Sequence, residues 1–512
     1  MTTMKKTILY ICLLGATLGM TSACKKDVLN QNAPDKLDSE TYWTSKERAL
    51  SGLAAAYSQI EGFVYWDNYV EARSVRNFYR EDYVQPGDDA YNYSWWMEHY
   101  NFNFTAGNYA IDLLWRENYR GIYYSNQVLE KVTAMPPAAI DDAARKQILA
   151  EAHFLRAYYH MNLLLNFDRI IIREKVPASE TDIPKQLSAR KESWDFICND
   201  LKQAEQTLPL RSARPATELG RATKGAAQAF LGKIYLYRAG EEKASAHTHY
   251  TDAATWLGKV YASGEYKLTE NFMNMFNGLG RNTTESIFEL QQTADVNNGA
   301  SYSSYLNDWM AASEMGGYGE IYGTGRLLKE MQQEGRVATD GNYDHRIYAT
   351  ILFNDPYFND PATRRAYGYT YHDIFGENAT TVAFRKWIPD SLNRLGRDNA
   401  INVPLVRLAD VMLMLAESYN ELGKPGEAMD LVNRVRARAA MPPLQSNDKQ
   451  IVFRYIMHER VMELTLEGCR FYDLRRWGLL PAKMQEAGRT FSPDKAFYPL
   501  PLKETVNNPM AH

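Results

Sequence analysis

Residues 405–440 read LVRLADVMLMLAESYNELGKPGEAMDLVNRVRARAA, and this stretch decides the fold. Small and apolar residues recur every three or four positions in each half, which is the spacing of one face of an α-helix. Gly423-Lys424-Pro425-Gly426 separates the two halves, and Pro442 with Pro443 follows the second. Because glycine and proline end helices, the stretch predicts two helices joined by a short turn.

The spacing within this helical pair is similar to that of a tetratricopeptide repeat. One face of each helix carries the small and apolar residues of that pattern: Met412, Leu415, Ala416, Tyr419, Ala428, Val432 and Val435. Ala416 is small enough to let the second helix approach, and Ala428 lets it cross closely. An ordinary amphipathic helix pair has much the same pattern, so copies elsewhere in the chain must decide between the two interpretations.

Three further segments carry the same first-helix spacing, at residues 50–57, 152–159 and 228–235. Candidate second helices lie at 119–132, 193–208 and 251–261. A helical hairpin cannot bury its apolar face alone, so repeated hairpins stack on one another. Four matches favour the repeat, and the sequence predicts a mainly α fold in which four tetratricopeptide-like helical hairpins form a curved scaffold.

Two long insertions interrupt the helical pattern, at residues 61–108 and 271–404. The first is dense in aromatic residues, and the second is rich in Tyr, Gly, Asn and Asp. Glycine and aspartate at this density indicate loops and short strands. Because insertions into a repeat scaffold usually carry its binding function, we expect these two to form a ligand-binding face.

The composition excludes some classes of partner. The chain has 512 residues, a net charge of −4 and no basic stripe, so no nucleic-acid partner is expected. No CxxC or HExxH motif occurs, and neither a metal nor a cofactor is expected. Cys198 and Cys469 lie far apart in the sequence; an exported protein could pair them, but two buried thiols are the favoured interpretation.

The N-terminus has the features of an export signal. Lys5 and Lys6 precede about a dozen apolar residues, too few to span a bilayer as a helix. Thr21-Ser22-Ala23-Cys24 resembles a bacterial lipobox, with Thr21 in place of the usual Leu, and this predicts a signal peptide at 1–23 and lipidation of Cys24. A simple secretory signal with an incidental cysteine is the alternative. Residues 24–40 would be a tether, and 41–512 a single domain.

The C-terminal region carries the most specific motif. HERVMELTLEGCRFYDLRRWG at 458–478, FYPLP at 497–501 and Asn508-Pro509 together closely resemble the SusD/RagB family of outer-membrane nutrient-binding lipoproteins. AEAHFLRAYYH at 150–160 and RATKGAAQAFLGKIYLYRA at 221–239 extend the resemblance over essentially the whole mature chain.

The resemblance implies a position and a partner. The protein would be anchored by lipid in the outer membrane, face the cell exterior and lie over a SusC-like TonB-dependent barrel. It would capture an oligosaccharide and deliver it by opening and closing like a lid, with the helical array facing the barrel.

The acidic residues of the C-terminal motif have two interpretations. Glu459, Glu463, Glu467 and Asp473 could form a catalytic carboxylate set, because paired acids hydrolyse glycosides. The favoured interpretation is a structural ion-pair network with neighbouring arginines, which tie the last helix to its loop: Arg460, Arg470, Arg475 and Arg476. In the family this segment is a fold signature, and no G-x-S-x-G motif occurs, so an enzyme is not expected.

A glycan binder needs rings that stack on sugar faces and planar polar groups for the hydroxyls. The first insertion offers Arg80, Trp95, Trp96 and Asn101, and the second offers Tyr302, Tyr305, Trp309, Tyr318 and Tyr322. Any one of these side chains could instead be packed in the core. They are a prediction by region, because binding positions vary between members of the family.

Three other functions stay open at the level of sequence. RagB-type members of the family import peptides, so the cargo could be a peptide. A helical-repeat scaffold lipoprotein that binds only proteins, and an α-helical glycosidase, are alternatives of other classes.

Overall fold

A computed structural model of the chain describes residues 42–60, 77–87, 89–293, 306–395 and 400–511. The predicted signal peptide, Cys24, the tether, Tyr302 and Tyr305 lie outside the described residues. None of the described helices is long and apolar enough to cross a membrane.

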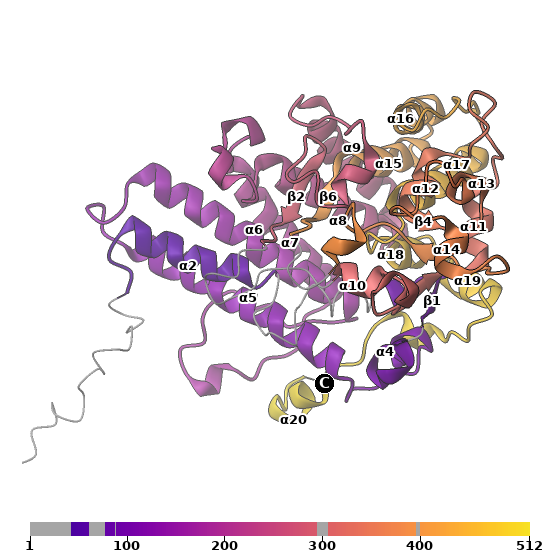
Figure 1. The fold of residues 1–512 in the computed structure, drawn as a ribbon. Coiled ribbons are helices and arrows are strands. Elements are labelled where there is room, and N and C mark those ends of the chain that lie inside the picture. The colour runs from indigo at the N-terminus through magenta and orange to yellow at the C-terminus, as the bar shows by residue number, and fades with distance from the viewer. Residues whose placement is uncertain (1–41, 61–76, 88, 294–305, 396–399, 512) are drawn as a thin grey trace, which may run out of the picture.

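Eight long helices form the four predicted hairpins, and the mainly α fold is confirmed. The pairs are α2 (Lys46–Ser58) with α5 (Tyr109–Ala134), α6 (Asp142–Asn166) with α7 (Arg190–Thr207), α8 (Lys224–Glu241) with α9 (Ala246–Ala262), and α15 (Leu408–Glu421) with α16 (Pro425–Arg438). Each hairpin packs on the next, through α5 on α6, α7 on α8 and α9 on α15 (Figure 1).

Local sequence sets where the helices begin and how closely they pack. The side chains of Asn108, Asp141 and Thr223 accept hydrogen bonds from the first backbone N–H groups of α5, α6 and α8, which is standard N-capping. Gly232 occupies the small position of the third hairpin. A Cβ atom there would lie 2.4 Å from Cγ of Leu257, so glycine is what lets α8 and α9 approach.

The two insertions contain the predicted short strands and, in addition, many short helices that the sequence did not predict. The first contains β1 (Val84–Pro86), η2 (Ala90–Asn92) and α4 (Ser94–Tyr100). The second contains η7 (Phe272–Met275), β2 (Ser286–Leu290), α10 (Leu306–Met310), η9 (Ser313–Met315), β3 (Ile321–Gly323), α11 (Gly325–Met331), α12 (His345–Thr350), β4 (Ile351–Leu352), α13 (Pro356–Asn359), α14 (Tyr371–Phe375), β5 (Ala383–Phe384), η10 (Leu392–Arg394) and β6 (Val403–Arg407).

Strand pairing joins the insertions to each other. Among the described residues the strands form three antiparallel pairs, β1–β3, β2–β6 and β4–β5. The β1–β3 pair sets Val84 opposite Gly323 and Pro86 opposite Ile321. Two segments more than 200 residues apart in the sequence therefore lie side by side, and in Figure 1 β1 and α4 lie beside the short elements of the second insertion.

Apolar side chains gather in two cores. The helical array encloses the first, which includes Leu155, Leu231 and Leu415. The two insertions enclose the second, which includes Ile347 and Phe384. Cys198 and Cys469 are buried free thiols, as predicted.

The C-terminal region spans both cores. It contains α17 (Lys449–Leu464), α18 (Arg470–Arg476), α19 (Leu480–Glu486), η11 (Pro493–Ala496) and α20 (Leu502–Asn507). Val452 and Ile456 of α17 belong to the first core, whereas Val461 and Met462 belong to the second. Because α17 packs in both cores, it holds the insertions against the helical scaffold.

Candidate ligand-binding surface

Five aromatic side chains from both insertions gather at the edge of the second core. We call Tyr91, Tyr93, Trp95, Trp309 and Tyr318 the aromatic patch. Tyr91 is 69% exposed and Tyr318 is 39% exposed. Tyr93, Trp95 and Trp309 are half-buried and rest against the second core. Each of these three side chains therefore combines a fixed position with an accessible part.

Ring contacts and backbone hydrogen bonds assemble the patch. The rings of Tyr93 and Trp95 meet edge to face at 5.4 Å, and Trp309 meets the ring of Trp96 in the same way at 5.6 Å. The backbone N–H of Tyr318 donates to the carbonyl of Asp308 at 2.7 Å. This bond and the β1–β3 pair hold η2, α4 and α10 next to one another.

A carboxylate pair lies behind the patch. Glu320 is 1% exposed, and the hydroxyl of Tyr79 donates to its carbonyl at 2.9 Å and to its carboxylate at 3.3 Å. Burial, and then the negative charge of half-buried Asp89, raise the pKa of Glu320 to about 8. Burial, Asp89, Glu320 and Tyr318 also raise the pKa of the Tyr93 hydroxyl. Asp89 and Glu320 are thus neighbours of the patch.

The structure divides the predicted site residues. Trp95, Trp309 and Tyr318 lie in the aromatic patch, whereas Trp96 and Tyr322 are buried in the second core beneath it. Asn101 is exposed just beyond the end of α4. Trp96 supports Trp309 and is not itself presented to a ligand.

The structure places Arg80, a predicted ligand-binding residue, outside the aromatic patch. Its side chain is fully buried, with the guanidinium carbon 4.0 Å from the ring centre of Phe471 and 4.4 Å from that of Tyr498. Its Nη2 donates to Asn77 and Asn166 at 2.9 and 2.8 Å. Arg80 therefore links the first insertion to the C-terminal region and is not accessible to a ligand.

Tyr91 and Tyr93 are patch residues that were not singled out from the sequence. They belong to YNYSWW at 91–96, where every second residue from Tyr91 to Trp95 is aromatic. This alternation could have identified Tyr91 and Tyr93 from the sequence. The insertion contains many other aromatic residues, several of them buried, and the alternation does not distinguish exposed rings from buried ones.

The carboxylates of the C-terminal motif form a buried ion-pair network, in line with the favoured interpretation. Glu463 is 0% exposed and its Oε2 lies 2.8 Å from Nη1 of Arg346, while its Oε1 lies 2.6 Å from Nη1 of Arg407 and also pairs with Arg438. The arginines around it lower the pKa of Glu463 well below its ordinary value.

The partners in this network differ from the expected ones. Glu459 pairs with Arg346 and Arg436, and these arginines come from α12 and α16. Of the local pairs, Arg460 contacts Asp473 at 2.7 Å. The glutamates of α17 therefore bind it to distant elements, and spacing along one helix could not identify those elements.

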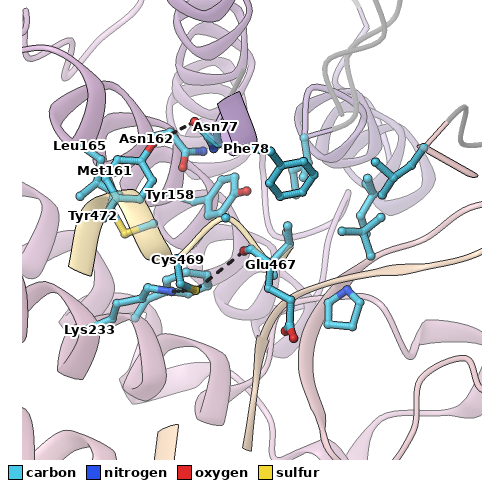
Figure 2. A pocket seen from close by; sticks show the side chains of 18 of the residues that line it. Asn77, Phe78, Tyr158, Met161, Asn162, Leu165, Lys233, Glu467, Cys469 and Tyr472 are labelled. Atoms are coloured by element: carbon cyan, nitrogen blue, oxygen red, sulfur yellow. Dashed lines mark hydrogen bonds between the residues drawn. The ribbon is translucent and has the colours of Figure 1, made fainter. Parts of the chain in front are cut away.

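A small cavity lies between the two cores (Figure 2). Its volume is about 90 Å³, and its lining includes Tyr158, Lys233, Cys469 and Tyr472. Lys233 Nζ is 3.2 Å from Asp410 and 3.9 Å from the sulfur of Cys469. Pockets for small molecules are typically about 300 Å³ or larger, so this cavity is too small for an oligosaccharide.

Two family models match the chain. The model described as the SusD family matches residues 284–509, and the model described as starch-binding associating with outer membrane matches residues 35–236. Trp95 falls in the second range, and Trp309 and Tyr318 fall in the first. The two matches therefore include the parts of both insertions that make the aromatic patch.

Similar proteins extend the match over nearly the whole chain. SusD-like protein P38 of Formosa agariphila is 24% identical, with 98% of each chain covered. The solved structure of a SusD superfamily protein from Bacteroides vulgatus has a TM-score of 0.79 at 24% identity, covering 92% of this chain and 99% of that one. A laminarin-binding SusD-like protein gives 0.73 at 23% identity, with coverage of 92% and 99%. The fold is therefore shared.

Proposed function

This chain belongs to the SusD family, and we propose that it binds an oligosaccharide at the aromatic patch. The observation that carries the proposal is the gathering of five accessible rings from two insertions at one edge of the second core. Such rings stack on the apolar faces of sugars, and their polar edges suit a wet surface. The printed name of one relative in structure, a laminarin-binding protein, supports a glycan as the ligand class.

The proposed mode of binding is capture without chemistry. The carboxylates of the C-terminal motif at 458–478 form ion pairs with arginines in the buried network. The aromatic patch, by contrast, offers stacking contacts. Several weak contacts allow both capture and later release. We propose that the protein holds the glycan unchanged and is not a glycosidase.

Isothermal titration calorimetry with a panel of oligosaccharides tests the glycan proposal. The double variant Trp95→Ala/Trp309→Ala should bind its best glycan at least about tenfold more weakly, equivalent to about 1.4 kcal/mol. Trp256→Ala is the matched control, because this half-buried tryptophan lies on α9 in the helical array. Equal affinity of the double variant and the control would contradict the proposal, and binding of peptides alone would favour peptide cargo.

We also propose that the glycan is delivered to a SusC-like TonB-dependent barrel that docks on the helical side. There α20 packs beside α5, with Trp115 donating to Glu504 at 3.1 Å and Lys503 pairing with Asp112 at 2.8 Å. A groove of about 500 Å³ lies between them. Leu502 and Val506, on the same helix α20, are 56% and 71% exposed. Exposed apolar side chains of this kind mark interaction surfaces.

Co-purification tests the docking surface. Leu502→Asp/Val506→Asp should reduce the amount of barrel recovered with the lipoprotein at least about tenfold, because charges are introduced into an apolar contact. Leu279→Asp is the control, since Leu279 is 57% exposed in the second insertion. Undiminished recovery with the double variant would place the contact elsewhere.

A further inference from the structure

Two acidic side chains lie next to the aromatic patch. Asp89 directly precedes η2, which carries Tyr91, and Glu320 follows Tyr318 by two residues. Together with burial, both carboxylates raise the pKa of the Tyr79 and Tyr93 hydroxyls. Over the described part of the chain, neither carboxylate is in a salt bridge with a lysine, arginine or histidine. No ion pair between the described residues therefore neutralises the charge of Asp89.

The backbone fixes these carboxylates in place. The N–H of Glu320 donates to the carbonyl of Trp309 at 3.2 Å, and the N–H of Gly87 donates to the carbonyl of Glu320 at 2.8 Å. Asn92 donates from Nδ2 to Asp89 at 2.5 Å. Asp89 lies near Glu320, and burial and the charge of Asp89 together raise the pKa of Glu320. Even with Glu320 protonated, Asp89 leaves negative charge next to the rings.

A ligand carboxylate or sulfate at the patch would meet this negative charge, which no ion pair between the described residues compensates. Like charges a few ångströms apart repel strongly where water is partly excluded. The hydroxyl of an uncharged sugar, by contrast, can donate to a carboxylate in a charge-assisted hydrogen bond. Asp89 therefore favours one class of sugar and opposes another.

We infer that the aromatic patch selects oligosaccharides of uncharged sugars over uronic-acid and sulfated ones, with Asp89 as the specificity-determining residue. This inference rests on the proposed glycan-binding function. It adds the ligand's charge class, which neither the fold nor the ring contacts specify.

Calorimetry on the purified full protein tests the selectivity. The probes are hexasaccharides of glucose, galactose and mannose, and hexamers of galacturonate and mannuronate. We expect at least one neutral probe to bind at least tenfold more tightly than either uronate. Asp89→Asn should narrow that ratio at least threefold, whereas Asp142→Asn, at an exposed position in α6, should leave it unchanged. Uronate affinity equal to or above neutral affinity would overturn the inference and leave glycan binding standing.

A second measurement needs no glycan and covers the case in which no sugar binds, which would itself refute the proposed function. Fluorescence quenching by caesium and by iodide is compared between the unaltered protein and Trp95→Phe, so that the difference reports Trp95. Negative charge at the patch predicts that, relative to free tryptophan amide, caesium quenches Trp95 more than iodide does. The reverse order would overturn the inference whatever the glycan panel shows.

Discussion

At the scale of single residues, Trp95 and Trp96 show how adjacent side chains take different roles. Successive residues of a helix point about 100° apart, so α4 turns Trp95 toward the patch and Trp96 into the second core. Trp96 is 6% exposed and packs edge to face on Trp309. Trp95 is therefore accessible to a ligand, whereas Trp96 fixes the position of Trp309.

Trp96→Ala should lower the free energy of unfolding by about 3 kcal/mol or more, because a large buried ring is replaced by a cavity. Trp95→Ala should cost clearly less, since part of its ring is already in water. Urea denaturation of both variants measures the difference. Equal losses would mean that both rings are core residues and that Trp95 is not a surface group.

The sequence predicted the region of the aromatic patch better than its individual members. Trp95, Trp309 and Tyr318 were predicted and lie in the patch. Arg80 carries the same planar polar group that a glycan site needs, but Phe471 and Tyr498 enclose it. Whether a ring or guanidinium faces water depends on contacts with residues hundreds of positions away, and local composition does not contain that information.

At the scale of elements, α17 holds the two cores together by charge. Glu463 is enclosed by Arg346, Arg407 and Arg438, which come from three different elements. The sequence predicted that the glutamates of the C-terminal motif pair with arginines; Glu459 and Glu463 do so from α17, whereas Glu467 lies beyond the end of that helix. Arg346 and Arg407 could not be predicted as partners, because α12 and β6 reach α17 only through the folding of the second insertion, whereas α16 directly precedes α17 in the chain.

Glu463→Gln should destabilise the protein by about 3–5 kcal/mol, because it leaves buried guanidinium groups without their shared carboxylate. Glu427→Gln, on the exposed side of α16, removes the same charge at a surface ion pair and should cost less than about 1 kcal/mol. Thermal or urea unfolding of the two variants measures the loss of stability in each. A mild effect of Glu463→Gln would show that the network contributes little to holding the cores together.

His458 on α17 gives the fold a pH dependence. Its Nδ1 lies 3.0 Å from Glu330 and its Nε2 lies 3.1 Å from Glu334. Although burial opposes the charge, hydrogen bonds to Glu330 and Glu334 raise the pKa of His458 to about 9. The folded state therefore favours the protonated imidazole.

Because the folded pKa lies above the unfolded value near 6.5, this stabilisation is complete below about pH 6.5 and is lost as the pH rises through 9. The difference in unfolding free energy between the unaltered protein and His458→Gln should shrink over that interval. Urea titrations at pH 6, 7.5 and 9.5 measure it. A difference that stays constant or grows with pH would contradict the assignment of a charged His458.

At the scale of the whole molecule, the helical scaffold follows from local sequence and the ligand surface does not. Each helix depends on a local residue pattern, and Gly232 and Ala416 could be recognised by spacing alone. The aromatic patch depends on the β1–β3 pair between residues 84–86 and 321–323. Strands this short carry little sequence signal, so their pairing becomes visible only in the folded chain.

Membrane attachment is a property of the whole chain that the lipobox predicts. Cys24→Ala should release the protein into the soluble fraction, because the described part of the chain has no helix that could hold it in a bilayer. Fractionation of cells followed by detergent phase partitioning measures the change. Retention of the variant in the detergent phase would refute lipidation at Cys24.

The central claim is that two distant insertions build one glycan-binding surface. The most direct test is a crystal structure of the protein with its tightest-binding oligosaccharide. We predict sugar rings stacked on Trp95 and Trp309, with Tyr318 alongside. A sugar bound against α5 and α20, or in any place that leaves the aromatic patch empty, would contradict the claim.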